Sequence, residues 1–132
     1  MNARHALIPR ARFLVAASFA LCGTTFFAAP GDAVRGATIY TANCGSCHSL
    51  DANRVGPAHR GIYGRKAGSA PGYAYSTPVK NSRIIWNANN LDRWLRDPRS
   101  VIPGTKMAFR LTDAQKRADV IAYLRQQSAG VR

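Results

Sequence analysis

The distribution of apolar positions predicts three helices joined by irregular segments. The first helix is predicted over 33–43, where Gly36 and Tyr40 share one face at i, i+4 spacing. Asp32 precedes this segment and can cap its free backbone N–H groups. A glycine inside a helix costs about 1 kcal/mol relative to alanine, so Gly36 indicates close approach of another helix. No segment shows the alternation typical of a strand, and the expected fold class is all-α.

Two further helices are predicted in the second half of the chain. Around residues 91–95, apolar positions recur at i, i+3 and i+4, and Pro98 ends the segment. The last helix is expected to start near Thr112, because Thr112 and Gln115 have the spacing of a capping box. Its apolar stripe is formed by Leu111, Ala114, Ala118, Ile121 and Leu124.

The segment 49–86 shows almost no periodicity, and it contains seven glycines and prolines by residue 72. A stretch of this length without secondary structure is uncommon inside a compact domain. A ligand that fills the core explains it, because the loop can then wrap around the ligand instead of packing on itself.

The pentapeptide Cys44-Gly45-Ser46-Cys47-His48 has the Cys-x-x-Cys-His pattern of covalent haem attachment. Two thiols at this spacing can each add to one vinyl group of a haem, and the adjacent imidazole can bind the iron. Cys-x-x-Cys also occurs in thioredoxin-like sites and in half of a zinc site. No βαβ pattern surrounds the motif, and the remaining cysteine, Cys22, lies far upstream, so haem attachment is the favoured interpretation.

Residues 1–29 have the pattern of a secretory signal peptide, with three arginines followed by an uncharged run over 13–29. Phe26 and Phe27 are unusual before a cleavage site, so an uncleaved N-terminal anchor is the alternative. The expected organisation is a signal peptide or anchor over 1–29 and one haem domain over 30–132. Bacterial c-type haem is attached outside the inner membrane, so the expected location is the periplasm, with membrane anchoring as the alternative.

The chain is strongly basic, with 19 lysines and arginines against six acidic residues, all of them aspartates. Without the three arginines of the N-terminal segment, the 103 residues of 30–132 have a net charge near +10. Such a surface fits an acidic protein partner, anionic lipid or nucleic acid, or it is a basic surface without a dedicated partner. No nucleic-acid motif is present and export argues against that class, so no nucleic-acid partner is expected.

Met107 is the only methionine besides Met1, and it follows a turn at Pro103-Gly104. A lone methionine commonly fills a core. Here it lies between two predicted helices in a chain with a haem motif, which makes it a candidate for the second axial ligand of the iron.

In order and spacing these motifs resemble class I cytochrome c, of the mitochondrial type and its bacterial soluble relatives, over residues 31–129. The resemblance rests on Gly36 and Tyr40, Cys44 to His48, Gly56-Pro57, Gly64 to Gly68, Gly72 to Ser76, Trp86, Pro103 to Met107 and Ile121 to Leu124. It implies a small all-α fold whose helices and loops wrap around one covalently bound haem c. The first helix is then expected to contact the last one through Val120 and Tyr123.

The resemblance also implies a set of site residues. Thioether bonds and axial ligation are implied for Cys44, Cys47, His48 and Met107. The carbonyl of Pro57 is expected to accept the ring N–H of His48. Hydrogen bonds to buried haem propionates are implied for Arg65, Tyr75, Trp86 and Thr105.

Two residues depart from the family pattern. His59 stands where a leucine is common; we interpret it as a surface or hydrogen-bonded histidine, with a competing iron ligand as the alternative. Trp94 stands where many members have a tyrosine that bonds the methionine sulfur, so the redox potential is not predicted.

The expected function is one-electron transfer without catalysis, because both axial positions of the iron would be filled. The expected partners are acidic faces of a cytochrome bc complex, a terminal oxidase, a reaction centre or a periplasmic dehydrogenase. Docking at the haem edge is expected to use the cations Arg54, Lys66, Arg99 and Lys106. The protein is expected to be a monomer that meets the membrane only through a partner or an uncleaved anchor. The alternatives are a haem peroxidase or gas-binding haem protein if the Met107 bond is weak, or a tethered cytochrome subunit of an oxidase or dehydrogenase.

Overall fold

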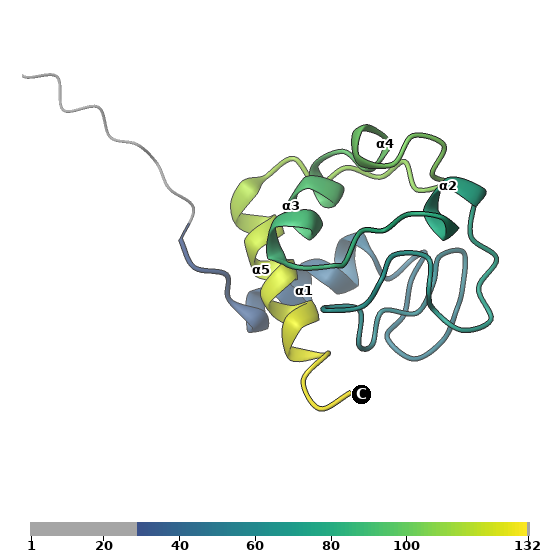
Figure 1. Cartoon of the computed structure of the whole chain (residues 1–132). Helices are drawn as coiled ribbons and strands as arrows, with labels where there is room; N and C mark the ends of the chain where they lie inside the picture. The colour runs from purple at the N-terminus through teal and green to yellow at the C-terminus, as the bar shows by residue number, and fades with distance from the viewer. Residues whose placement is uncertain (1–28, 132) are drawn as a thin grey trace, which may run out of the picture.

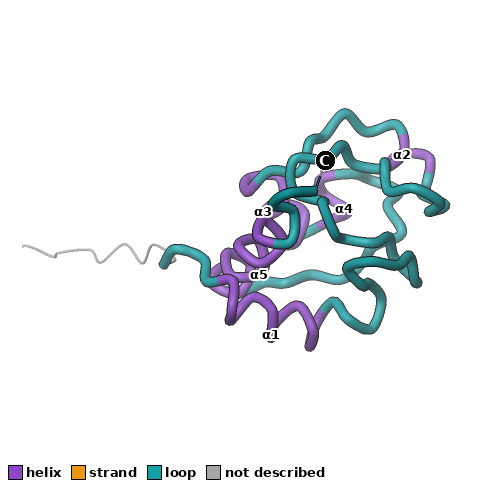
Figure 2. The backbone as a smooth tube through the Cα atoms, turned by 90° about the horizontal axis from the view of Figure 1, so that it is seen from below, coloured by secondary structure: helices purple, strands orange, loops and turns teal. Residues whose placement is uncertain are grey.

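The computed structural model describes residues 29–131. It contains the helices α1 (Ala33–Asn43), α2 (Thr77–Lys80), α3 (Ala88–Arg96), α4 (Pro98–Val101) and α5 (Ala114–Gln126). Among the described residues the only β pairing is an isolated bridge between Lys66 and Ile85, and loops make up the rest (Figure 2). The all-α prediction is confirmed. The predicted signal segment 1–29 lies, apart from Ala29, outside the described residues.

Helices α1 and α5 pack closely against each other (Figure 1). A Cβ atom on Gly36 would lie 2.0 Å from the backbone oxygen of Asp119 and 2.8 Å from the Cβ of Tyr123. The rings of Tyr40 and Tyr123 pack with their centroids 5.3 Å apart, beside the fully buried Val120. Because only a glycine leaves room for this approach, the close helix contact predicted from Gly36 is confirmed.

The carboxylate of Asp119 joins the start of α1 to α5. Its side chain is 3% exposed and accepts hydrogen bonds from the backbone N–H of Asp32 at 2.8 Å and from Nε and Nη2 of Arg35 at 2.9 Å each. The amide of Gln115 donates a further bond at 3.1 Å. The Arg35 bonds are the main cause that lowers the pKa of Asp119 to about 2, with the Asp32 and Gln115 bonds adding to them against the opposing effect of burial.

The start of α5 differs from the prediction by one residue. The N-cap is Asp113, whose carboxylate accepts the backbone N–H of Lys116 at 2.9 Å. The predicted capping box from Thr112 to Gln115 is therefore wrong. An aspartate at the cap position bonds the free N–H groups directly, which leaves the Gln115 side chain free to reach Asp119.

Helix α3 carries Leu91 and Leu95 into the core and ends just before Pro98, as predicted. Pro98 also begins α4, where its missing N–H costs nothing in the first helical turn. The sequence analysis did not identify α2 and α4, which are four residues each and too short to show helical periodicity.

The segment between α1 and α2 has no helix or strand, in line with the irregular stretch predicted there. Residues 61–63 contact the C-terminal end of α5 and the turn after it, and much of the remainder lies on the side of the molecule away from α5 (Figure 1). Backbone bonds hold it to the segment before α3: Gly64 N–H donates to the Trp86 carbonyl at 2.7 Å, and Trp86 N–H donates to the Arg65 carbonyl at 2.9 Å. Within residues 29–131 no helix has the length and apolar character needed to cross a membrane.

Candidate functional site

A cavity of about 390 Å³ lies where the loop after α1 faces α3, α5 and the segment after α4. Nine residues predicted to hold the haem line this cavity: Cys44, Cys47, His48, Pro57, Arg65, Tyr75, Trp86, Thr105 and Met107. Core side chains complete the walls, among them Ile62, Val79, Leu91, Leu95, Val120 and Leu124. The cavity is therefore a mainly apolar space with a few polar groups at defined places, the usual character of a cofactor site.

The end of α1 places the two cysteines and the histidine on the cavity wall. Cys44 is the C-cap residue of α1, and its carbonyl accepts the N–H groups of Cys47 at 3.1 Å and of His48 at 2.8 Å. This tight turn brings all three side chains to the same space. Burial raises the pKa of the Cys44 thiol to about 11, so the unmodified thiol is protonated at neutral pH.

The imidazole of His48 is oriented by the loop that follows it. Its Nδ1 lies 2.8 Å from the carbonyl of Pro57, so Nδ1–H donates there and Nε2 keeps its lone pair. A Cβ on Gly56 would lie 2.1 Å from Cε1 of the ring, so a glycine is needed for the backbone to approach this closely. Burial lowers the pKa of His48, which favours the neutral ring that can bind a metal.

His59 is partly buried and hydrogen-bonded. Its ring stacks on the ring of His48 with the centroids 4.0 Å apart, and its Nδ1 lies 3.1 Å from the hydroxyl of Tyr40. Burial lowers the pKa of His59 well below its usual value, and the neighbouring charges of His48 and Arg65 add to the effect. Because His59 lies face to face with His48, it is not placed to bind an iron from the side opposite His48. Of the interpretations given for His59 in the sequence analysis, the structure shows the hydrogen-bonded histidine.

Met107 reaches the cavity from the loop between α4 and α5. Its backbone N–H donates to Oγ1 of the buried Thr105 at 3.2 Å, and Thr105 N–H donates to the Ile102 carbonyl at 3.2 Å. Nζ of Lys106 donates to the Ala74 carbonyl at 3.0 Å and ties this loop to the opposite rim. Trp94 lines the same cavity, with its ring centroid 5.1 Å from that of Trp86.

Several polar groups in the cavity wall could bind the carboxylates of a haem. Arg65 donates through Nη2 to the Ala58 carbonyl at 3.0 Å, and the hydroxyl of Tyr75 accepts the Ala70 N–H at 3.2 Å. Ser76 also lines the cavity, and its Oγ is buried with no hydrogen-bond partner among the described residues. A buried hydroxyl without a partner is costly, so it fits a propionate oxygen as acceptor.

Ser76 is a site residue that the sequence analysis did not single out. It is the last residue of the Gly72 to Ser76 motif used for the family resemblance, and that position was the available signal. The lining residues therefore fit a haem in three respects: paired thiols beside an imidazole, a thioether, and polar side chains that include an unpaired hydroxyl.

The four predicted docking cations are all exposed but are not all at the cavity. Lys66 and Lys106 line it, whereas Arg54 and Arg99 do not. Arg54 lies close by, because its Nη1 donates to the Gly45 carbonyl at 2.7 Å within the haem-attachment turn.

Two exposed apolar side chains also line the cavity and were missed by the sequence analysis. Val55 is 76% exposed and Phe109 is 40% exposed. Single exposed hydrophobic residues are common, and only the cavity shows that these two share one rim.

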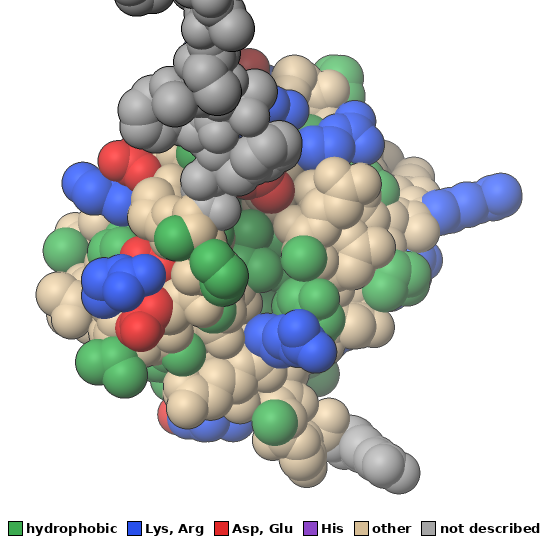
Figure 3. Space-filling view, turned by 90° about the vertical axis from the view of Figure 1, so that its left-hand side faces the viewer, with side chains coloured by type: hydrophobic (Ala, Val, Ile, Leu, Met, Phe, Trp, Pro, Cys, Tyr) green, Lys and Arg blue, Asp and Glu red, His purple; other side chains and the backbone are tan. Residues whose placement is uncertain are grey.

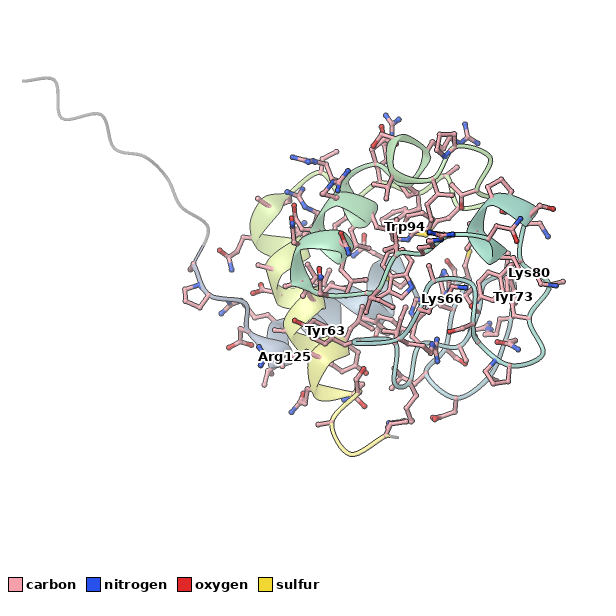
Figure 4. All side chains as sticks on the ribbon, in the orientation of Figure 1. Tyr63, Lys66, Tyr73, Lys80, Trp94 and Arg125 are labelled. Carbon is pink, nitrogen blue, oxygen red and sulfur yellow. The ribbon has the colours of Figure 1, made fainter. Side chains whose placement is uncertain are left out.

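Lys66 and Tyr73 lie on the α2 side of the molecule, away from Tyr63 and Arg125 (Figure 4).

Comparison with known proteins gives consistent results. The family model "Cytochrome c" matches residues 33–128. Cytochrome c of Euglena viridis is 46% identical over 98 residues, which cover 72% of this chain and 96% of that protein. Cytochrome c2 of Rhodomicrobium vannielii is 44% identical over 103 residues, 75% of this chain and 82% of that protein. The solved structure of cytochrome cH from Methylobacterium extorquens matches with a TM-score of 0.70 and 44% identity, covering 73% of this chain and 99% of that one.

Proposed function

The chain belongs to the cytochrome c family and carries one covalently attached c-type haem, and from this premise we propose that it is a periplasmic one-electron carrier with His48 and Met107 as axial ligands. Electron transport by a haem protein is the function common to this family. The observation that supports the ligand assignment is that His48 and Met107 line the same cavity as Cys44 and Cys47.

The bound haem supplies an iron that gains and loses one electron. The carbonyl of Pro57 holds His48 in the tautomer that leaves Nε2 free, and the Thr105 hydroxyl holds the backbone of Met107. A thioether ligand raises the redox potential relative to a second imidazole. With both axial positions filled, no coordination position is left for a substrate, so we propose electron transfer without catalysis.

Replacement of Met107 by Ala tests the ligand assignment. The variant should lose the methionine-to-iron charge-transfer absorption band of the ferric protein, and it should bind cyanide and CO readily. Arg99→Gln is the control, because Arg99 is exposed on α4 and does not line the cavity, so this substitution should leave the band intact. An unchanged band in Met107→Ala would exclude Met107 as ligand. Rapid CO binding by the unmodified protein would favour the gas-binding or peroxidase alternative.

We further propose that the partner docks at the cavity rim and is acidic. Lys66 and Lys106 flank the rim, and Val55 and Phe109 add apolar contact area. Basic side chains are also spread over the face shown in Figure 3, several of them beside acidic ones, so basic residues are not confined to the cavity rim. A net positive charge steers an acidic partner over long range, and salt screens this attraction over about 8 Å at physiological strength.

Electron-transfer kinetics with an isolated membrane oxidase or bc complex test the docking proposal. The second-order rate should fall steeply with rising ionic strength. The double variant Lys66→Gln with Lys106→Gln should slow association more than the control Lys116→Gln with Arg125→Gln, which removes the same charge from α5. Equal effects of the two double variants would show that only the overall charge matters, and a rate independent of salt would contradict electrostatic steering.

Location in the periplasm is supported by the basic and then uncharged pattern of residues 1–29 and by the bacterial cytochrome c2 and cytochrome cH among the relatives. The intact mass of the protein purified from its native cells tests this. A mass equal to the chain without its N-terminal segment, plus one haem, supports export and cleavage. A full-length mass in the membrane fraction supports a tethered subunit instead.

A further inference from the structure

The ring of His59 lies flat against the ring of His48, and nothing in haem attachment or ligation gives it a role. The ring centroids are 4.0 Å apart and the ring planes differ by 21°. A leucine, which the family resemblance places at this position, packs without a preferred plane. An imidazole presents a flat face, so it can restrict the plane of the ring that it contacts.

His59 is held by both its side chain and its backbone. Its Nδ1 shares a hydrogen bond with the Tyr40 hydroxyl at 3.1 Å. Its N–H donates to the Ser49 carbonyl at 3.0 Å, and its carbonyl accepts the N–H of Ile62 at 3.0 Å. Tyr40 is itself buried in the last turns of α1, against Tyr123 of α5. The ring of His59 is therefore fixed relative to the helix pair and not only to its own loop.

The other contacts of His48 leave a restraint for His59 to supply. The Pro57 carbonyl bonds a single ring atom, Nδ1, at 2.8 Å, and the backbone at Gly56 packs against the ring near Cε1 without a hydrogen bond to it. One hydrogen bond fixes a point of the ring but allows the plane to rock about it. A second ring stacked in parallel opposes that rocking, because any rotation reduces the contact between the two faces.

We propose that Tyr40 and His59 form a positioning pair that fixes the plane of the axial imidazole of His48. The inference rests on the proposed ligation of iron by His48. In a low-spin ferric haem, the plane of the axial imidazole determines how its π orbitals overlap with the iron orbitals, and hence how unpaired spin is distributed over the haem. Partners of a metal-bound histidine that fix its ring orientation are a general feature of metal sites.

The test is proton NMR of the ferric holoprotein at one fixed pH, in which the four haem methyl shifts report the ligand plane. His59→Leu removes the flat ring, and Tyr40→Phe removes only the hydroxyl that holds it. Tyr63→Phe is the control, because it removes a tyrosine hydroxyl next to Arg125 and outside the cavity. Both site variants should change the order or spread of the methyl shifts. The double variant should change them no more than His59→Leu alone, since the hydroxyl acts through His59.

The outcomes separate this inference from the proposed ligation. A wild-type spectrum without low-spin haem methyls and without a strongly shifted methionine methyl would contradict the ligation itself. With a normal wild-type spectrum, methyl shifts that move no more in His59→Leu and Tyr40→Phe than in Tyr63→Phe overturn the positioning pair. If His59→Leu does not fold, Tyr40→Phe decides alone: a changed pattern supports the pair and an unchanged one overturns it.

Discussion

The four hydrogen bonds at Asp119 predict a stability that depends on acid pH. We consider the substitution Asp119→Asn, which keeps the size of the side chain and removes its charge. In the folded protein the pKa of Asp119 is about 2, against an ordinary value of 3.8. A folded pKa below the unfolded one means that the group contributes its full stability above the unfolded pKa and loses it as the pH falls toward the folded pKa.

The magnitude follows from this difference. At 1.36 kcal/mol for each pKa unit, the difference between 3.8 and about 2 corresponds to about 2.4 kcal/mol. The main partner, Arg35, has a side chain that is 55% exposed, so solvent screening reduces the value. We expect Asp119→Asn to lower the free energy of unfolding by about 2 kcal/mol at pH 7, and by about half as much at pH 3.

The assay is urea unfolding of the holoprotein followed by circular dichroism at pH 7, 5 and 3. The loss should be the same at pH 7 and 5 and smaller at pH 3. Arg35→Gln and the double variant complete a cycle, and coupling between the two sites should account for most of the loss at pH 7. If the loss in Asp119→Asn is as large at pH 3 as at pH 7, the stabilisation is not ionic and the reasoning fails.

Three further predictions concern the α1–α5 contact and the two loops that carry His48 and Met107. Gly36→Ala places a methyl group 2.0 Å from a backbone oxygen of α5, so it should lower the free energy of unfolding, measured with urea or heat, by about 3 kcal/mol. The control Ala37→Gly on the same helix should lower it by about 1 kcal/mol. Gly56→Ala places a methyl group 2.1 Å from the His48 ring; it should lower haem incorporation, measured by the haem-to-protein absorbance ratio, and normal incorporation would contradict the packing. Thr105→Val removes the acceptor of the Met107 N–H, a hydrogen bond worth about 1 kcal/mol. The rate of cyanide binding to the ferric protein, measured by stopped flow, should therefore rise about fivefold. An unchanged rate would show that other contacts hold the loop.

The features that sequence reasoning predicted are those whose signal is local. The bounds of α1, the end of α3 at Pro98 and the close approach at Gly36 all follow from residues within a few positions of one another, and each is confirmed. The Cys44 to His48 motif is equally local.

The features that sequence reasoning missed depend either on a choice between adjacent residues or on contacts between distant segments. The pattern at 112–115 fits a capping box, but Asp113 captures the free N–H group, and local spacing does not rank two adjacent caps. The stacking of His59 on His48 depends on the path of the loop and on Tyr40 in another element, so the sequence left its interpretation open. The unpaired hydroxyl of Ser76 is visible only once the cavity walls are in place.

The two proposed axial ligands differ in how much of the fold each one needs. His48 follows Cys47 directly and lies in a turn in which the N–H groups of Cys47 and His48 donate to the Cys44 carbonyl. Met107 comes from a distant loop that reaches the cavity only when α3, α4 and α5 are packed. Because the attachment residues are local in the sequence, we expect that the haem can be joined to a short stretch of unfolded chain and can then serve as the nucleus around which the loop 49–76 condenses. We therefore expect closure of the proposed Met107–iron bond to be the last step of assembly, in which case the bond proposed to set the redox potential would also report that the chain has finished folding.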